Sequence, residues 1–389
     1  MRLRQRGLVR RRGAWSNVRM KNGDTAVLAI GTKKGLWLAE SADRQAWNVT
    51  GPHFLMDEVA SLAIDTRSGT PRILAGIMNW HWGPCVVHSD DRGATWSEPE
   101  DGAVRFPEDT GEALARVWQL QPDSDARPGV VWAGAEPISV WKSTDGGEHF
   151  EMNRPFWDHP HRSEWGAGFG GAAAHTVLPS PADDSVHVAI SAAGVYRTDD
   201  GGASWAPRNN GISAYFLPDP HPEFGQCVHK AARDAGDPRR LYAQNHHGVY
   251  RSDDSGDSWV SIAEGLPADF GFVMLAHPTR PGTIWTIPLK ADGERIPPDG
   301  HPAVYRSTDA GGTWTRLDRG LPETDFNAVL RDAAAVDNGE PAGVYFGTRG
   351  GQVFASADEG DTFSLVAGNL PDVLCVRAGI VSAEPEPAR

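Results

Sequence analysis

The sequence predicts an all-β chain that folds as a seven-bladed β-propeller. A turn motif recurs seven times, strand-like segments repeat in phase with it, and the last strand-like segment lacks a partner of its own. The composition agrees, because 44 Gly and 29 Pro among 389 residues suit many short strands joined by turns. No stretch of about 18 apolar residues occurs, so we expect no transmembrane helix and no membrane partner.

The turn motif reads Ser/Thr-x-Asp-x-Gly-x-Thr/Ser and ends on an aromatic residue. One copy has His149 in place of the second hydroxyl residue, and the first copy, at 41–47, is one residue short and lacks the Gly. The Asp residues stand at positions 43, 91, 145, 200, 254, 309 and 358, which are 48 to 55 residues apart. Four strands and their connections need a repeat of about this length.

Each position of the motif has a structural task. The Ser/Thr and Asp side chains accept hydrogen bonds from amides of the turn, and the Gly supplies a positive φ. The aromatic residue packs between neighbouring sheets. We therefore expect the motif to stabilise a hairpin and to take no part in chemistry.

The two ends of the repeat predict how the ring closes. The chain begins with the second strand of a blade at 25–30, and it ends with an unmatched first strand at 374–380. We expect 374–380 to be the inner strand of the sheet that contains 25–47, because such closure removes exposed sheet edges. The propeller then spans 24–382, between a basic extension (1–23) and a tail (383–389) that are both expected to be disordered.

The motifs and their phase resemble the BNR/Asp-box superfamily, which includes sialidases, xyloglucan-type glycosidases, the sortilin luminal domain and a photosystem II assembly factor. The resemblance covers about residues 24–382 and implies the fold, whereas the shared motif is architectural and says little about function. A sialidase is not expected. The Arg-Ile-Pro at 295–297 lies in a late loop rather than before the first motif, and Tyr215 is the one obvious loop candidate for a nucleophile.

Charge and cysteine content restrict the partners and the compartment. Residues 1–19 hold seven Arg and no acidic residue, so the net charge of −14 leaves the remainder strongly acidic. A surface of that sign repels phosphate backbones, and we expect no nucleic-acid partner. The basic head lacks the apolar segment of a secretory signal, and Cys85, Cys227 and Cys375 are odd in number and far apart. Both observations favour a cytoplasmic location.

Candidate site residues lie on the face opposite the turn motifs, where the loops vary in length and chemistry. Loops and inner strands of several blades carry Trp, His, Arg and Lys there, and we expect these side chains to converge on a central pocket. The expected substrate contacts are Trp80, Trp82, Arg116, Trp118, Lys230, Asn245 and Arg349. The expected catalytic residues are His81, His175, His229, His246 and Glu112.

Three of the histidines are also candidate metal ligands: His175, His229 and His246. Neutral imidazoles from different blades can converge on one divalent ion. We expect His175 and His229 to line the channel and to border water, so that replacing either costs little stability. Trp80 and Trp82 flank His81 and are typical of a platform that stacks on a sugar ring.

Two classes of function fit this pattern. One is a hydrolase or lyase that binds and acts on a small or glycosidic substrate, by paired carboxylates or with a histidine-bound metal. The other is a non-catalytic scaffold or assembly factor that binds a protein partner on the same face. The sequence leaves the substrate, the metal and the oligomeric state open.

Overall fold

The computed structural model describes residues 20, 23–67, 70–168 and 170–382. Of the basic extension 1–23, residues 1–19 and 21–22 lie outside the described residues, as does the tail 383–389, so the expected disorder of both stays a prediction. No helix in the described residues is long and apolar enough to cross a membrane.

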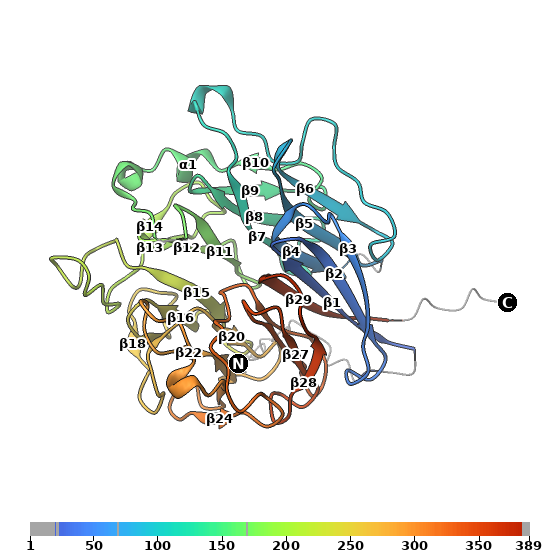
Figure 1. Cartoon of the computed structure of the whole chain (residues 1–389). Helices are drawn as coiled ribbons and strands as arrows, with labels where there is room; N and C mark the ends of the chain where they lie inside the picture. The colour runs from blue at the N-terminus through green and yellow to red at the C-terminus, as the bar shows by residue number, and fades with distance from the viewer. Residues whose placement is uncertain (1–19, 21–22, 68–69, 169, 383–389) are drawn as a thin grey trace, which may run out of the picture.

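The described strands form seven antiparallel blades around a central axis (Figure 1). Blade 1 contains β29 (Val373–Val381), β1 (Thr25–Thr32), β2 (Gly35–Ser41) and β3 (Asn48–His53); blade 2 contains β4 (Glu58–Asp65), β5 (Arg72–Asn79) and β6 (Gly83–Ser89). Blade 3 contains β7 (Arg116–Pro122), β8 (Val131–Glu136), β9 (Ser139–Ser143) and β10 (Glu151–Met152); blade 4 contains β11 (Ala174–Pro179), β12 (Val186–Ile190), β13 (Gly194–Thr198) and β14 (Ala206–Pro207). In blade 2 an isolated bridge between His88 and Ser97 stands in for a fourth strand.

The remaining blades follow the same order from the axis outward. Blade 5 contains β15 (Val228–Arg233), β16 (Leu241–Asn245), β17 (Val249–Ser252) and β18 (Val260–Ser261). Blade 6 contains β20 (Leu275–Ala276), β21 (Ile284–Thr286), β23 (Val304–Ser307) and β24 (Thr315–Leu317), extended by the pair β19 (Phe270–Gly271) and β22 (Pro288–Leu289). Blade 7 contains β25 (Ala334–Val336), β26 (Val344–Gly347), β27 (Val353–Ser356) and β28 (Ser364–Ala367). Short helices occupy the loops: α1 (Arg154–Trp157), η1 (Glu108–Thr110), η2 (Pro160–Glu164) and η3 (Pro298–Gly300).

The C-terminal strand closes the ring. β29 pairs with β1 in antiparallel register from Thr25–Val381 to Thr32–Val373, and Figure 1 shows the red end of the chain beside the blue one. The predicted seven blades and their closure are both confirmed.

The turn motifs, which we call Asp boxes, form the hydrogen bonds expected of them. The Oδ1 atom of Asp200 accepts hydrogen bonds from the Thr198 hydroxyl at 2.6 Å and the Ser204 amide at 2.9 Å, and its Oδ2 accepts one from the Ser204 hydroxyl at 2.6 Å. In the box with the unusual histidine, His149 Nδ1 lies 2.9 Å from Asp145 Oδ2 and takes the place of that hydroxyl. The imidazole therefore preserves the turn.

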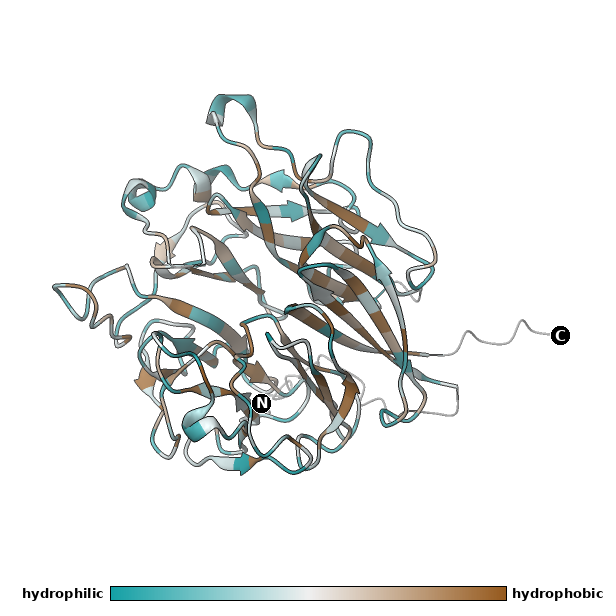
Figure 2. Cartoon of the chain, in the orientation of Figure 1, coloured by the Kyte–Doolittle hydropathy of each residue, from teal (hydrophilic) through white to brown (hydrophobic). Residues whose placement is uncertain are grey.

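Apolar side chains pack between neighbouring blades, so the strands are the most hydrophobic part of the chain (Figure 2). Between blades 3 and 4, for example, Val140, Val177, Val188 and the box residue Trp205 belong to one buried cluster. Burial of this kind supplies most of the driving force for folding.

Candidate functional site

A pocket of about 660 Å³ opens at the centre of the ring, and we call it the central pocket. Three aromatic side chains, Trp118, Phe216 and Phe272, contribute to its wall. The cations that line it are Lys33, Arg116, Arg295, Arg331 and Arg349, against the acids Asp292 and Asp332.

Inner strands present side chains to this pocket through a repeated β-bulge. The pairing of the inner strand with its neighbour skips one residue in blades 1, 2, 3 and 5, namely Leu374, Ala60, Trp118 and His229. All four skipped residues line the central pocket. A bulge adds one residue to a strand and changes the direction of its side chain, so in these four blades it provides a position in the pocket wall.

His175 is the skipped residue of blade 4, and there the expectation is wrong. Its side chain is 0% exposed and does not border water, and Nδ1 lies 3.2 Å from the Thr176 hydroxyl. Burial, followed by the charge of Arg331, holds the pKa of His175 well below its usual value. The side chain is therefore a neutral core group, and replacing it would cost stability.

Arg331 lines the pocket without a counter-ion among the described residues. Its guanidinium lies 5.3 Å from the ring centre of Trp118 and 5.9 Å from that of Phe272. Its Nε is buried without a hydrogen-bond partner, and no described residue forms an ion pair with it. Burial lowers the pKa of Arg331, but a guanidinium stays protonated in proteins at neutral pH.

Neighbouring cations are held by partners within the protein. Arg116 Nη2 lies 2.7 Å from Glu58 Oε1, and Arg349 Nη2 lies 2.7 Å from Asp372 Oδ2. The Arg295 Nε–H donates to the carbonyl oxygen of Asp292 at 2.8 Å. Lys33, which also lines the pocket, is exposed to solvent. Arg331 is therefore the more buried of the two pocket cations with whose side chains the described residues form neither an ion pair nor a hydrogen bond.

On one wall of the pocket, a cysteine and two histidines converge. One ligand atom each from Cys227, His229 and His246 lie within 4.8 Å of one another, and this is the group of potential metal ligands found among the described residues. His229 Nδ1 lies 2.5 Å from the carbonyl oxygen of Gly271, and His246 Nε2 lies 3.4 Å from Asp292 Oδ2. Burial lowers the pKa of His229 to about 3 and also lowers that of His246, so both imidazoles are neutral at pH 7.

Some of the predicted site residues line the central pocket, and others do not. Arg116, Trp118, His229, His246 and Arg349 line the central pocket, and their roles stay predictions. His229 is only 3% exposed and bonds to the Gly271 carbonyl oxygen, so the expectation that it borders water and can be replaced at little cost in stability is wrong.

Two predicted polar contacts are instead part of the framework. Lys230 is buried, and its Nζ lies 2.6 Å from Asp332 Oδ1; it lines a separate cavity of about 440 Å³ rather than the central pocket. Asn245 is 0% exposed, and its amide donates to the carbonyl oxygens of Ser213 and His247. The Lys230 ammonium and the Asn245 NH2 group therefore bond within the protein rather than face the central pocket.

Residues of two loops lie outside the lining of the pocket. Trp80 and Trp82 are 79% and 84% exposed, and His81 and Glu112 are exposed as well. The Asn79 side-chain oxygen accepts hydrogen bonds from the His81 and Trp82 amides, which directs this loop into solvent. The expectation that Trp80, His81 and Trp82 surround the central pocket is therefore wrong.

Sequence reasoning missed Cys227, Phe272 and Arg331 as pocket residues. Cys227 and His229 stand two positions apart at the start of an inner strand, where a shared direction could have been expected. Arg331 shortly precedes the inner strand β25, in the phase at which other blades carry pocket residues. An alignment of the inner-strand sequences with one another would have pointed to these positions.

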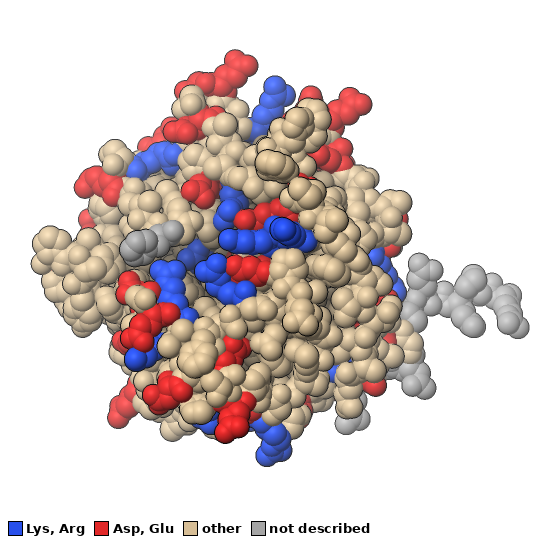
Figure 3. Space-filling model, in the orientation of Figure 1, with Lys and Arg blue, Asp and Glu red and all other residues tan. Residues whose placement is uncertain are grey.

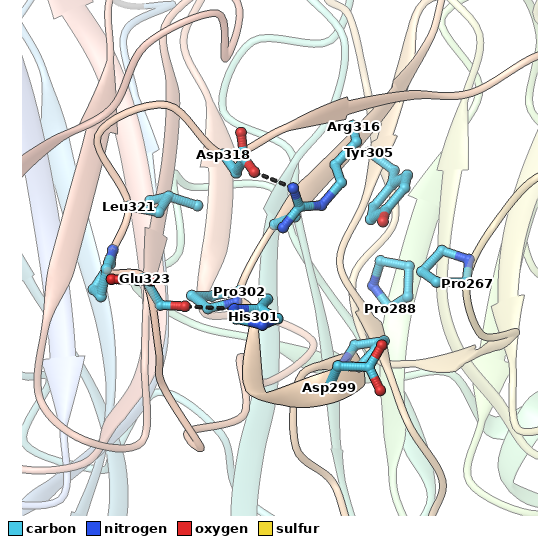
Figure 4. Close-up of a pocket in the computed structure, with 13 residues that line it drawn as sticks. Pro267, Pro288, Asp299, His301, Pro302, Tyr305, Arg316, Asp318, Leu321 and Glu323 are labelled. Carbon is cyan, nitrogen blue, oxygen red and sulfur yellow. Dashed lines mark hydrogen bonds and ion pairs between the residues drawn. The ribbon is translucent and has the colours of Figure 1, made fainter.

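A second pocket, of about 430 Å³, lies in blade 6 (Figure 4). Its polar groups pair with one another: Arg316 forms an ion pair with Asp318, and His301 Nδ1 lies 2.6 Å from the carbonyl oxygen of Glu323. None of the predicted site residues lies there, so the central pocket is the candidate site.

No protein-family model matches the chain, and no curated protein matches its sequence. Among solved structures, the GH74 enzyme of Niastella koreensis is similar, with a TM-score of 0.52, 15% identity and coverage of 79% of this chain and 45% of that enzyme. A candidate 6-phosphogluconolactonase of Bacteroides fragilis gives a TM-score of 0.56 and 11% identity, over 91% of this chain and 98% of that one. YCF48 bound to D1 peptide gives a TM-score of 0.47 and 13% identity, over 88% and 97%.

The chain spans less than half the length of the GH74 enzyme. At these identities the likeness shows the β-propeller fold alone.

Proposed function

We propose that the central pocket binds, and acts on, a small anionic substrate: a small molecule or sugar that carries a carboxylate or a phosphate. The observation that carries the proposal is the guanidinium of Arg331, whose Nε is buried without a hydrogen-bond partner and which has no counter-ion among the described residues. A buried charge is costly unless an opposite charge meets it. A bound anion would supply that charge through charge-assisted hydrogen bonds.

The distribution of charge supports an anionic ligand. The chain carries a net charge of −14, yet Lys and Arg gather near the centre of the face that Figure 3 draws, with acidic side chains common around its edge. Of the two acids that line the pocket, Asp332 is already paired with Lys230 and Arg377. A basic pocket in an acidic molecule concentrates anions at that one place.

Size and wall chemistry restrict the ligand to a small molecule. A volume of about 660 Å³ is within the range of small-molecule sites. Trp118 and Phe272 present ring faces beside Arg331, which suits a ligand with one charged group and one apolar or sugar-ring face.

Acid–base chemistry in this pocket would fall to histidine rather than to paired carboxylates. Glu112 is exposed and lies outside the pocket lining, and Asp332 is held by two cations. His246, with Asp292 3.4 Å away, is the neutral base beside the cations. This arrangement favours a hydrolase or lyase that uses an imidazole or a metal over a two-carboxylate glycosidase.

A second candidate, a scaffold for a protein partner, is favoured by one observation. Leu55, Met56, Trp80 and Trp82 are 59%, 68%, 79% and 84% exposed, and a hydrogen bond of 3.0 Å from Asn79 to Asp57 joins their two loops. Exposed apolar groups of this size are typical of interaction surfaces. A cytoplasmic location stays a prediction, to be tested by cell fractionation.

The proposal is tested by titrating a panel of carboxylates and phosphates, each paired with its neutral counterpart, such as glucuronate with glucose. We expect an anion to bind and its neutral counterpart not to bind. Arg331→Gln should weaken binding about 10- to 100-fold, as expected for the loss of hydrogen bonds to a charged group. Arg316→Gln, in the pocket of Figure 4, is the matched control and should leave the affinity unchanged. Equal binding of charged and neutral ligands, or an unaffected Arg331→Gln variant, would refute it.

A further inference from the structure

We propose that Cys227, His229 and His246 form a site for a divalent transition-metal ion of the zinc type in the wall of the central pocket. The three residues offer one thiolate and two imidazoles, the ligand types that zinc and cobalt prefer. The proposal stands apart from anion binding, because metal uptake can be measured with no anion present.

The distances allow one ion to reach all three ligands. Their potential ligand atoms lie within 4.8 Å of one another, whereas a tetrahedral zinc with ordinary bond lengths holds such atoms about 3.3–3.7 Å apart. Side-chain rotations of Cys227 and His246, neither of which is fully buried, would close the difference.

The backbone fixes the three residues as one unit. Cys227 precedes β15, and the β-bulge at His229 directs that side chain to the pocket. The His246 amide donates a 2.9 Å hydrogen bond to the Cys227 carbonyl oxygen, so the loop after β16 is tied to the start of β15. Cys227 and His246 are thereby held next to each other, beside His229, without help from a metal.

A second hydrogen bond sets the tautomer of His229. Its Nδ1 lies 2.5 Å from the Gly271 carbonyl oxygen, so Nδ1–H donates and Nε2 keeps its lone pair. Metal-bound histidines usually donate their other N–H group in this way, which orients the ring and raises the basicity of the ligand. The buried imidazole is ready to bind before the ion arrives.

Three charged side chains lie close to the proposed metal ligands. Asp292 offers a carboxylate 3.4 Å from His246 Nε2, while Arg331 and Arg295 act on Cys227 and His229 from the pocket side. When the metal binds, the Cys227 thiol releases its proton to solvent and the sulfur–metal bond forms. The thiolate and Asp292 then offset the two charges of the ion itself, while the two arginines keep the pocket positive. Three protein ligands leave a fourth position of a tetrahedral ion for water or a substrate, as in catalytic zinc sites.

The test is a titration of the metal-free chain with Co²⁺, followed by absorbance, and with Zn²⁺, followed by calorimetry. We expect one ion per chain and a thiolate-to-cobalt charge-transfer band in the near ultraviolet. Cys227→Ser should abolish the band, and His246→Ala should weaken binding at least about tenfold. Bound Zn²⁺ should also slow alkylation of Cys227.

Cys85→Ser and His247→Ala are the matched controls, because Cys85 lies in blade 2 and His247 is the neighbour of His246 outside the cluster. Both should bind metal like the unchanged chain, and thermal unfolding should show that all four variants fold. Failure of the unchanged chain to bind one ion, or a charge-transfer band that survives in Cys227→Ser, would overturn the proposal. Anion titrations of the metal-free chain would still decide the proposed function separately.

Discussion

Asp332 joins two cations beneath the central pocket. Its Oδ1 lies 2.6 Å from Lys230 Nζ and 2.8 Å from Arg377 Nη2, and the carboxylate is 3% exposed. Burial raises the pKa of Asp332, but the charges of Lys230 and Arg377 outweigh it and lower the pKa overall. Asp332 lines both the central pocket and the cavity that contains Lys230. The ion pairs therefore lie between the two cavities.

Replacing Asp332 by Asn should destabilise the fold strongly. The change leaves Lys230 and Arg377 as uncompensated, largely buried charges, for which a loss of about 3–5 kcal/mol is expected. Asp372→Asn, which breaks the more exposed pair with Arg349, should cost no more than about 1 kcal/mol. Urea unfolding measures both, and equal losses for the two variants would contradict the account of Asp332.

The sequence predicted which positions of the repeat reach the pocket better than it predicted the direction of individual side chains. Arg116, Trp118, His229 and His246 could be placed at the pocket because inner strands and their loops surround the axis. The solvent-directed turn of Trp80 and Trp82 could not be, because it depends on the Asn79 side chain, and the repeat carries no information on it.

Elements, by contrast, could be predicted almost completely. The Asp boxes recur in phase, and their hydrogen bonds are local, so the sequence contains every partner that the turn needs, as at Asp200. The β-bulges could not be predicted from the sequence. A bulge shows in the pairing of two strands, and the residue skipped at Trp118 or His229 has no local signature of its own.

Ring closure can be tested by shortening the chain. A chain that ends at Asp372 loses β29 and leaves β1 with an open inner edge, so we expect a lower unfolding midpoint and a less cooperative transition. A chain that ends at Ser382 keeps β29 and serves as the control. Calorimetry distinguishes the two, and an unchanged transition for the shorter chain would show that β29 does not close the ring.

The whole molecule should lose stability in two stages as the pH falls. Burial lowers the folded-state pKa of His187 and of His229 to about 3. Their stabilising contribution is therefore complete above the unfolded pKa of about 6.5 and is lost as the pH falls toward 3. Below about pH 4 we expect a second loss of stability, because the carboxylates of the Asp boxes become protonated. Hydrogen bonds, the largest effect coming from the Thr95 hydroxyl, lower the pKa of Asp91 to about 2.

Unfolding free energies measured in urea with a chelator present should show the first stage. Between pH 6.5 and pH 5 we expect a loss of up to about 2 kcal/mol for each of these two histidines. His187→Gln should give a shallower slope over that interval. A profile that is flat from pH 7 to pH 5 would mean that the histidines are not held neutral by the fold.

In the proposed function, the guanidinium of Arg331 in the central pocket receives an anion. The crystal structure of the chain with the anion that binds most tightly tests it directly. We expect a carboxylate or phosphate oxygen within hydrogen-bonding distance of Arg331, with the rest of the ligand against Trp118 and Phe272. An anion bound elsewhere, with the central pocket filled by water alone, would contradict it.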